Sequence, residues 1–468
     1  MKRSTRHLWT TILVTSSLAP ATMAGPTDAG DSRPSIVLLL ADDAGWQDFG
    51  FQGSAEFDTP ALDRLASEGI VLDACYVTAS VCSPSRAGLL TGRQQQRFGH
   101  EYNLPGTAPR AEGGLPLGER TIADRLRDAG YATGIVGKWH LGLDDAFLPT
   151  ARGFDEFRGL RAGSRSYFGD ERLEGSDRAW ERIDQDSHDE VVESDVAYVT
   201  DLVATESVDF VERHADHPFL LIASFTAPHT PMHALPGDLA AVSTDLRPER
   251  RRVCAAMTIA LDRACERIVE AVDATGRESI VIFLGDNGGA TNNGSDNGPL
   301  RGMKGSHFEG GVRVPAVWRA TGGRSGRIPH PLSVLDLDAT LLAMARADVA
   351  GIDGIDIRPW LEADRRDRPR QVLQWRRGPV ATIRDRDLKA IRVDGRHTLL
   401  FDLATDPSEI DDLSSDHPGE VVRLLASLAA WEHGLHEPLW TTGPRWRDNL
   451  LRKHDQSVTG RDAERRLP

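Results

Sequence analysis

The sequence has little cysteine, no long apolar run and a shortage of positive charge, and each shortage excludes a class of protein. Four cysteines in 468 residues are too few for a disulfide-stapled scaffold. No stretch after residue 24 approaches the ~20 apolar residues that a membrane-spanning helix needs. Lys and Arg number 55 against 70 Asp and Glu, a net charge of −15. Because nucleic acid and anionic membranes bind basic faces, neither is expected as a partner, and any anion must meet a local positive site.

The length and apolar content allow a folded protein with a sizeable core. The 468 residues, 40% of them hydrophobic, are enough for two or more domains. Three basic residues among the first six precede a moderately apolar stretch from Leu8 to Leu18, and small residues near Ala24 offer a cleavage point. This pattern is typical of an export signal, although Thr and Ser in the stretch also fit an unstructured leader. We predict a signal peptide over 1–24 and an exported protein, periplasmic or extracellular.

Short apolar runs alternate with amphipathic helical patterns up to about residue 345. This alternation is typical of an α/β domain with a mostly parallel sheet. The clearest buried strands are expected at Ser35–Ala41, Tyr131–Val136, Phe219–Phe225 and Ser279–Leu284. Capping residues, Pro and Gly predict helices between and after them, at 60–69, 83–92, 121–129 and from 248 onward.

The composition changes after Asp364. The Arg- and Asp-rich stretch ADRRDRPR indicates a linker or an exposed loop. Short antiparallel strands are expected at 372–375, 380–383, 390–393 and 398–402, followed by a helix at 418–431. Residues after 442 are polar, basic and aperiodic, and we expect them to wrap the surface or fray. We therefore predict a large catalytic domain over 33–364, a small C-terminal α+β domain over 365–442 and a tail over 443–468.

Polar residues follow each of the four expected strands of the large domain. In strand order they are Asp42 and Asp43, Lys138 and His140, His229, and Asp286 and Asn287. In open α/β sheets, ligands bind at the carboxyl ends of the strands. We therefore expect these side chains to converge on one site.

Four of these residues offer only oxygen ligands: Asp42, Asp43, Asp286 and Asn287. Oxygen ligands suit a hard cation such as Ca²⁺ or Mg²⁺ and do not suit Zn²⁺. Adjacent carboxylates also repel each other unless a cation neutralises them. Taken singly, each of these segments could be an ordinary turn, because Asn-Gly is a common turn signal. Together they predict a metal site.

Cys82 lies just before an expected helix with Ser83 as N-cap, Pro84 as the first residue and Gly92 past the end. The backbone N–H groups and the dipole of a helix N-terminus favour an anion, and Arg86 adds a positive charge one turn inside. Such a place could hold a tetrahedral oxyanion against a nucleophile. On these residues alone, a buried structural cysteine is an equally good interpretation.

The positions of the other cysteines say little about disulfide bonds. A pair between Cys75 and Cys82 is possible in principle. Cys254 and Cys265 lie about 16 Å apart along one expected helix, so they cannot bridge each other. We expect them to be buried free thiols.

The segment from Cys82 to Gly92, CSPSRAGLLTG, resembles the signature of the type I sulfatases, in which that cysteine becomes formylglycine after translation. A second family signature is similar to GYATGIVGKWH at 130–140. The resemblance covers about residues 35–435 in family order, with further matches at 42–43, 228–231, 286–288, 300–305, 309–311 and 313–315. It implies the alkaline-phosphatase-like fold, with a central sheet between helical layers and a small antiparallel C-terminal sheet.

The resemblance also implies roles for individual residues. The Ca²⁺ ligands of the family, with Mg²⁺ less favoured, are matched by Asp42, Asp43, Asp286, Asn287 and the modified Cys82. A hydroxyl of the formylglycine hydrate would attack sulfur, its charge stabilised by the ion and by Arg86. Lys138, His229 and Lys304 resemble the groups that bind the sulfate and bridging oxygens. His229, assisted by Lys304, would protonate the departing alcohol, and His140 would take a proton so that the aldehyde re-forms.

The substrate class follows from a further resemblance. The polar segment 97–103 resembles one found in relatives that act on sulfated polysaccharides, so a carbohydrate sulfate is expected and His100 is the expected sugar contact. A hydrogen-bonded loop histidine is an equal alternative for His100. The region 160–195 is expected to form part of the rim. A formylglycine-generating enzyme is the implied maturation partner.

Two other functions stay open. A phosphatase or phosphonate ester hydrolase of the same superfamily would share the fold and part of the metal site, but CSPSR with a single expected cation fits a sulfatase better. A catalytically silent sulfoglycan-binding protein would need a lost catalytic group, whereas each catalytic position identified here is filled.

Overall fold

The structure is a computed structural model that describes residues 31–104, 113–169, 179–184, 187–190, 197–370 and 372–455. The chain divides into two units, Met1–Ser32 and Arg33–Pro468, and the fold described here is that of the second unit. The predicted signal peptide over 1–24 lies outside the described residues. Among the described helices, none is both long and apolar enough to cross a membrane.

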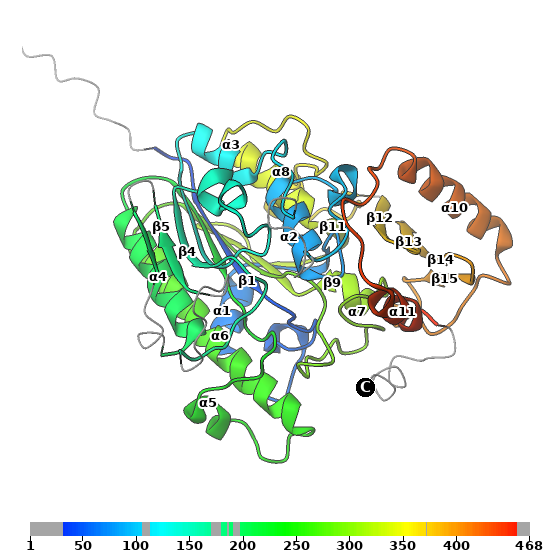
Figure 1. Ribbon diagram of the computed structural model, residues 1–468, viewed down its shortest axis with the longest axis horizontal. Coiled ribbons are helices and arrows are strands. Elements are labelled where there is room, and N and C mark those ends of the chain that lie inside the picture. The colour runs from blue at the N-terminus through cyan, green and yellow to red at the C-terminus, as the bar shows by residue number, and fades with distance from the viewer. Residues whose placement is uncertain are drawn as a thin grey trace, which may run out of the picture. The chain divides into compact units, whose positions relative to one another are not determined.

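A large, mostly parallel sheet runs through the unit (Figure 1). In sheet order its described strands are β11 (Gly326–Ser333), β2 (Ile70–Tyr76), β10 (Ala316–Ala320), β8 (Ser279–Gly285), β1 (Ser35–Ala41), β7 (Phe219–Ser224), β3 (Ala132–Lys138), β4 (Glu156–Leu160), β5 (Glu181–Ile183) and β6 (His188–Glu190), with β9 (Arg313–Val314) beside β2. The strands from β8 to β4 are parallel, whereas β10, β5 and β6 run antiparallel to their neighbours. The predicted α/β class is confirmed.

Strand β1 lies at the centre because its sequence is apolar on both faces. All seven of its residues are buried, and it pairs in parallel with β7 on one side and with β8 on the other. Such continuous apolar runs are typical of parallel strands that are covered on both faces. The strands expected at residues 131, 219 and 279 are observed as β3, β7 and β8, with ends shifted by one or two residues.

Helices cover both faces of the sheet. The described α-helices of this part are α1 (Pro60–Glu68), α2 (Cys82–Thr91), α3 (Ile122–Asp128), α4 (Val199–Arg213), α5 (Pro236–Ala241), α6 (Glu249–Ala274), α7 (Glu309–Val312), α8 (Val334–Met344) and α9 (Arg358–Glu362). Short 3₁₀ turns lie at Gly50–Gln52, Gln95–Phe98, Asp145–Phe147 and Pro149–Arg152. Alternate residues of β1 enter two separate cores: Leu38 packs on the side of α2, α3 and α8, and Leu39 on the side of α1, α4 and α6. The predicted helical layers are thereby confirmed.

A separate antiparallel sheet follows in the C-terminal part. Its strands are β12 (Val372–Arg377), β13 (Val380–Asp385), β14 (Leu388–Val393) and β15 (His397–Asp402), in sequence order. Helix α10 (Pro418–Glu432) packs Leu424 and Leu428 on one face of this sheet. The indole of Trp375 donates a hydrogen bond of 2.7 Å to the carbonyl of Val77, which follows β2. The small sheet is thus joined directly to the large one.

The residues after 442 differ from the expectation of an aperiodic tail. Pro444–Lys453 form helix α11, and its Leu450 and Leu451 pack with Val380 and Phe401 on the other face of the small sheet. The helix escaped detection because its two buried leucines are adjacent and lie among arginines, so the apolar spacing is too short to show a helical period. The proposed domain boundaries themselves stay a prediction.

Candidate active site

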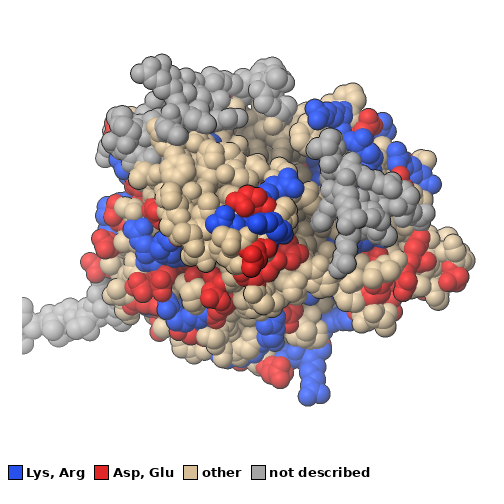
Figure 2. All heavy atoms as spheres, turned by 90° about the horizontal axis from the view of Figure 1, so that it is seen from below, with Lys and Arg blue, Asp and Glu red and all other residues tan. Residues whose placement is uncertain are grey.

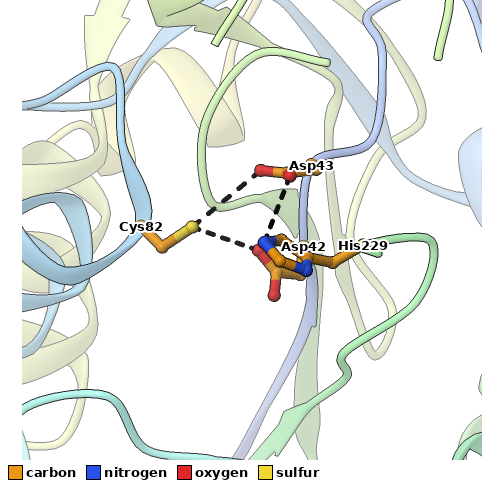
Figure 3. A group of neighbouring side chains, drawn as sticks. All are labelled: Asp42, Asp43, Cys82 and His229. Carbon is orange, nitrogen blue, oxygen red and sulfur yellow. Dashed lines mark hydrogen bonds and ion pairs between the residues drawn. The ribbon is translucent and has the colours of Figure 1, made fainter. Parts of the chain in front are cut away.

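The carboxyl ends of β1, β3, β7 and β8 meet at one place, as the sequence predicted. Asp42 and Asp43 follow β1 directly, and the side chain of Cys82 faces them from the first turn of α2 (Figure 3). His229, in the loop after β7, completes a group of four residues whose ligand atoms all lie within 4.8 Å of one another. Figure 3 shows these side chains pointing toward a common centre.

Cys82 lies on one side of this group, with its sulfur directed toward both carboxylates (Figure 3). Its thiol donates to Asp42 Oδ1 at 3.4 Å and lies 3.9 Å from Asp43 Oδ1. The side chain is only 1% exposed. Burial, together with the charge of Asp42, raises the pKa of the Cys82 thiol well above its ordinary value.

The start of α2 lies two residues before the predicted start. Cys82 is itself the first helical residue, with extended Val81 as N-cap and no side-chain capping bond. Ser83, the predicted N-cap, instead places its hydroxyl 2.7 Å from His100 Nε2. Gly92 ends the helix in the left-handed conformation, at φ 63°, as predicted. The shift puts Cys82 closer to the backbone N–H groups of the first turn.

Three cations, the buried Lys138 and Arg86 and the partly exposed Lys304, each pair with one carboxylate of the site. Lys138 Nζ lies 2.5 Å from Asp42 Oδ2, Arg86 Nε lies 3.0 Å from Asp286 Oδ2, and Lys304 Nζ lies 2.7 Å from Asp43 Oδ1. Lys304 Nζ also donates to Cys82 Sγ at 3.1 Å. On the face drawn in Figure 2, basic and acidic side chains of the described residues are interspersed over the surface. The site, in contrast, gathers three positive charges around one thiol.

The electrostatics of the carboxylates follow from these partners. Burial opposes ionisation of Asp42, but Lys138, His229 and Arg86 outweigh it and hold the Asp42 pKa well below its usual range. Burial and the neighbouring charge of Asp42 raise the pKa of Asp286 to about 7. Burial likewise opposes the charged form of Lys304, and Asp43 more than offsets it, so that the Lys304 pKa is well above its usual value.

The donor set fits a hard divalent cation. Asp286 Oδ1 accepts from the Asp43 backbone N–H at 3.3 Å, and Asn287 Nδ2 donates to Asp43 Oδ1 at 2.7 Å. Asn287 Oδ1 is fully buried and has no hydrogen-bond partner among the described residues. A buried amide oxygen without a partner is costly, and a cation bound by it would remove that cost. The oxygen atoms of Asp42, Asp43, Asp286 and Asn287 would suit a hard cation, and a metal held there would stabilise Asp286 in its ionised form.

The three predicted histidines lie in different surroundings. His229 Nδ1 donates to the Thr230 carbonyl at 2.6 Å, which leaves Nε2 facing Asp43 Oδ2 at 3.5 Å. His140, at φ 63°, has no partner among the described residues for its buried Nδ1, and burial with the charge of Lys138 lowers its pKa well below the usual value. Burial favours the neutral form of His140, and a neutral ring can accept a proton at one nitrogen. Burial also lowers the pKa of His229, whereas the neighbouring Asp42 and Asp43 favour its protonated form. His140 and His229 keep their predicted roles as proposals.

His100 is placed away from solvent. It is fully buried, its ring packs edge-on against Trp440 at 4.7 Å, and burial lowers its pKa to about 3. Its Nε2 is occupied by Ser83. These contacts support the first turn of α2 from behind, and the expected sugar contact of His100 stays a prediction.

The sequence did not reveal the residues that fix the strand-end loops. Asn293 Nδ2 donates to the carbonyls of Asp43 and Pro228, each at 3.1 Å. Tyr167, in the described part of the expected rim region, is buried and donates to the carbonyls of Thr226 and His229 at 2.6 and 2.9 Å. An Asn in a loop or a Tyr in an irregular region carries no local signal for such a role.

Comparisons with known proteins agree with this geometry. Residues 34–347 match the family model described as Sulfatase. The chain is 30% identical to mouse arylsulfatase J over 86% of this chain and 76% of that protein, and 35% identical to mouse N-acetylgalactosamine-6-sulfatase over 72% and 68%. Among solved structures, Ps i-CgsB, also solved in complex with k-i-k-neocarrahexaose, superposes with a TM-score of 0.81 at 31% identity, over 89% of this chain and 97% of that chain. A phosphonate monoester hydrolase of Agrobacterium radiobacter, 21% identical with a TM-score of 0.64, shares the fold.

Proposed function

Because this chain belongs to the sulfatase family, within the alkaline-phosphatase-like superfamily, we propose that it is a carbohydrate sulfatase whose nucleophile is residue 82 in the formylglycine form. Hydrolysis of sulfate esters is the activity of the family. The observation that carries the proposal is the position of Cys82. It begins α2 between an acidic cluster and three cations, with Asp42 Oδ1 3.4 Å and Lys304 Nζ 3.1 Å from its sulfur.

The cations form a receptor for the sulfate group. Lys138, Arg86 and Lys304 supply N–H donors around Cys82, in a site whose carboxylates are almost fully buried. In a low-dielectric site, preorganised donors stabilise the charge that develops in the transition state. Arg86 is held rigidly for this role, because it also donates to Ser224 Oγ at 2.6 Å and to the Lys138 carbonyl at 3.0 Å.

A divalent cation, which we propose to be Ca²⁺, would be held by Asp42, Asp43, Asp286 and Asn287 together with modified residue 82. This proposal is supported by the oxygen atoms that the three aspartates and Asn287 offer. It is also supported by Asn287 Oδ1, which has no hydrogen-bond partner among the described residues. When bound, such an ion supplies positive charge that lowers the pKa of an attached hydroxyl and stabilises negative oxygen.

Two histidines would move the protons. His229 presents Nε2 on the side of Asp43, with Lys304 on the same carboxylate. In its protonated form, which Asp42 and Asp43 favour, it would carry a proton at Nε2 and transfer it to the departing sugar oxygen. His140 follows β3 on the Lys138 side and is neutral, so it can accept the proton released when sulfate leaves residue 82. Separate acid and base groups allow the two half-reactions to use different protons.

The substrate class is supported by the relatives. One acts on N-acetylgalactosamine 6-sulfate by its name, and another was solved with an oligosaccharide bound. We propose a sulfated glycan as substrate, a formylglycine-generating enzyme as maturation partner, and export to the periplasm or the cell exterior, where such glycans occur.

The test uses protein produced together with a formylglycine-generating enzyme. The peptide that contains residue 82 should show the mass loss from thiol to aldehyde. Sulfate release should be measured on 4-nitrophenyl sulfate and on galactose and N-acetylgalactosamine sulfates, before and after chelation, with Ca²⁺ and Mg²⁺ added back separately. We expect release that chelation abolishes and that Ca²⁺ restores.

Three results would contradict parts of the proposal. A converted chain that releases no sulfate from any ester would refute the activity and leave a sulfoglycan-binding role. Hydrolysis of phosphonate esters in place of sulfate esters would assign the other activity of the superfamily. Full activity without conversion of Cys82 would refute the nucleophile.

A further inference from the structure

A second group of positive charge lies beside the proposed nucleophile and has no part in the chemistry above. Arg377 is the last residue of β12 and Lys453 the last residue of α11. Both reach Gly305: a Cβ added there would lie 3.0 Å from Lys453 Nζ and 3.2 Å from Arg377 Nη1. The same point is 3.8 Å from Val81 Cγ1, and Val81 is the N-cap of the helix that begins with Cys82.

The two cations connect to the site through one residue. Lys453 Nζ donates to the backbone carbonyl of Lys304, whose side chain reaches Cys82 Sγ at 3.1 Å. Arg377 Nη1 is 3.4 Å from the carbonyl of Gly305, the next residue. The C-terminal part of the chain therefore delivers two positive charges to the edge of the sulfate receptor.

These charges have no negative partner. Lys138, Arg86 and Lys304 each pair with a carboxylate, whereas within the described residues no Asp or Glu forms an ion pair with Arg377 or Lys453. Arg377 is 8% exposed and its Nε has no hydrogen-bond partner among those residues. A buried guanidinium without a counter-charge is costly, and that cost persists unless a ligand supplies the anion.

The pKa values of Arg377 and Lys453 are those expected of largely buried cations that lack a negative partner. Burial lowers the pKa of Arg377 to about 10. Burial, Arg377 and Lys304 lower the pKa of Lys453 to about 7. Arg86 and Lys304, which pair with carboxylates, have raised pKa values instead.

We propose that Arg377 and Lys453 form a subsite for a second anionic group of the substrate, a sulfate or a carboxylate carried by the sugar whose sulfate is cleaved or by its neighbour. A guanidinium fork and an ammonium group together match the oxygens of either anion. Tyr102, in the segment 97–103, lies under Arg377, with its ring centre 5.9 Å from the guanidinium carbon. Tyr102 is buried, so its ring supports the guanidinium of Arg377 from within the protein. This inference rests on the proposed sulfatase activity.

The test compares inhibitors with one and two anionic groups. The reporter is the sulfate ester that the mature wild-type protein hydrolyses fastest. The competitors are disaccharides matched in sugar and linkage, with one sulfate, with two sulfates, or with one sulfate and one uronic acid carboxylate. We expect a two-anion disaccharide to have an inhibition constant at least tenfold lower than its one-sulfate counterpart. Comparing the disulfated disaccharide with the one that carries a sulfate and a carboxylate identifies which second anion is preferred.

Substitutions test whether the preference for two-anion disaccharides depends on Arg377 and Lys453. Arg377→Gln and Lys453→Gln should each reduce the preference for two anions to less than threefold. Lys453 is partly exposed and lies at the end of α11, so Lys453→Gln is expected to fold. It therefore keeps the test valid if Arg377→Gln does not fold. The matched control is Arg452→Gln on the same helix, whose side chain is exposed and bonds only Asn449 among the described residues. This control should keep the full preference. Melting temperatures establish that each variant is folded.

The outcomes separate this inference from the activity on which it rests. If the wild type hydrolyses a sulfate ester but shows no two-anion preference, or if the preference survives in both Gln variants, the subsite is refuted and the activity stands. If no sulfate ester is hydrolysed by a converted chain, the proposed activity fails first and the subsite falls with it.

Discussion

Two buried charge clusters lie near α7, and one of them includes its residue Glu309. Comparing the two distinguishes a candidate functional site from a structural contact. In the first, around Cys82, Asn287 Oδ1 and Arg86 Nη2 have no partner among the described residues. In the second, Lys389 lies between Glu309 and Glu409 at 2.8 and 2.9 Å, and the remaining oxygen of Glu309 accepts from Tyr76 at 2.5 Å.

Burial of charge alone therefore does not identify a site. The Lys389 cluster ties β14 of the small sheet to α7 and to β2 of the large sheet, and its charges satisfy one another. The Cys82 cluster keeps donor and acceptor atoms unused, which a ligand could engage. Glu409 Oε1 of the Lys389 cluster also lacks a hydrogen bond, but it lies 2.9 Å from Lys389 Nζ and is neutralised by that charge. What distinguishes the Cys82 cluster is an uncharged oxygen, Asn287 Oδ1, that has no partner among the described residues.

The sharpest contrast is expected for residue 82. Cys82→Ala should lower sulfate release by at least about 10⁴-fold, because the nucleophile is removed, while leaving the melting temperature nearly unchanged. The matched control is Cys265→Ala, a buried thiol on α6, which should keep full activity and lose only a little stability. Substantial release by Cys82→Ala would assign the nucleophile elsewhere.

The second cluster should show the opposite behaviour. Lys389→Met leaves two carboxylates buried side by side, so we expect the free energy of unfolding in urea to fall by about 3–5 kcal/mol, with kcat/KM of the folded fraction kept. Arg392→Met, on the same strand in a partly exposed pair with Glu432, should cost at most about 1 kcal/mol. A loss of activity in folded Lys389→Met would make this cluster part of the catalytic machinery.

Asp286→Ala tests whether the Cys82 cluster binds a metal ion. Removing this proposed oxygen ligand, which also pairs with Arg86, should weaken Ca²⁺ binding and lower kcat/KM by at least about 100-fold. Calcium titration followed by calorimetry measures the first effect and sulfate release the second. Asp273→Ala, whose carboxylate pairs with Arg319 at the surface, is the control expected to match the wild type. Unchanged calcium affinity in Asp286→Ala would remove this residue from the ligand set.

The smallest expected effect is a pH dependence of the anion preference. The pKa of Lys453 lies at about 7, lowered by burial, Arg377 and Lys304 and raised slightly by Asp43. Its charge is present below that pH and lost above it, so the preference for two-anion disaccharides should fall by about threefold as the pH rises from 6 to 8.5. Lys453→Arg should remove this dependence, because a guanidinium stays charged. A preference that is independent of pH in the wild type would exclude Lys453 as a contact.

The sequence predicted what depends on local pattern. The run Ile36–Leu40 identified a central strand because parallel strands are apolar on both faces, and Asp42 and Asp43 could then be placed at its carboxyl end. The start of α2 was displaced by two residues, because Ser83 is a typical N-cap residue but its side chain contacts His100 instead.

What was missed depends on long-range packing. Helix α11 is held by the face of the small sheet around Phe401, which no pattern within the helix reveals. Arg377 and Lys453 come from two segments without any motif, in a chain with 55 basic residues, so only the folded structure brings them to Gly305.

The burial of Cys82 has a consequence for the timing of synthesis. Asp42 lies 40 residues before the thiol, but Lys304 lies 222 residues after it, and the folded chain leaves only 1% of Cys82 exposed. At about 5–20 residues per second, a ribosome needs roughly 10–45 s to add those 222 residues. Until then, part of the cover of the thiol does not exist. An enzyme that modifies Cys82 has its best access in that interval, so the rate of elongation and the rate of modification compete for each new chain.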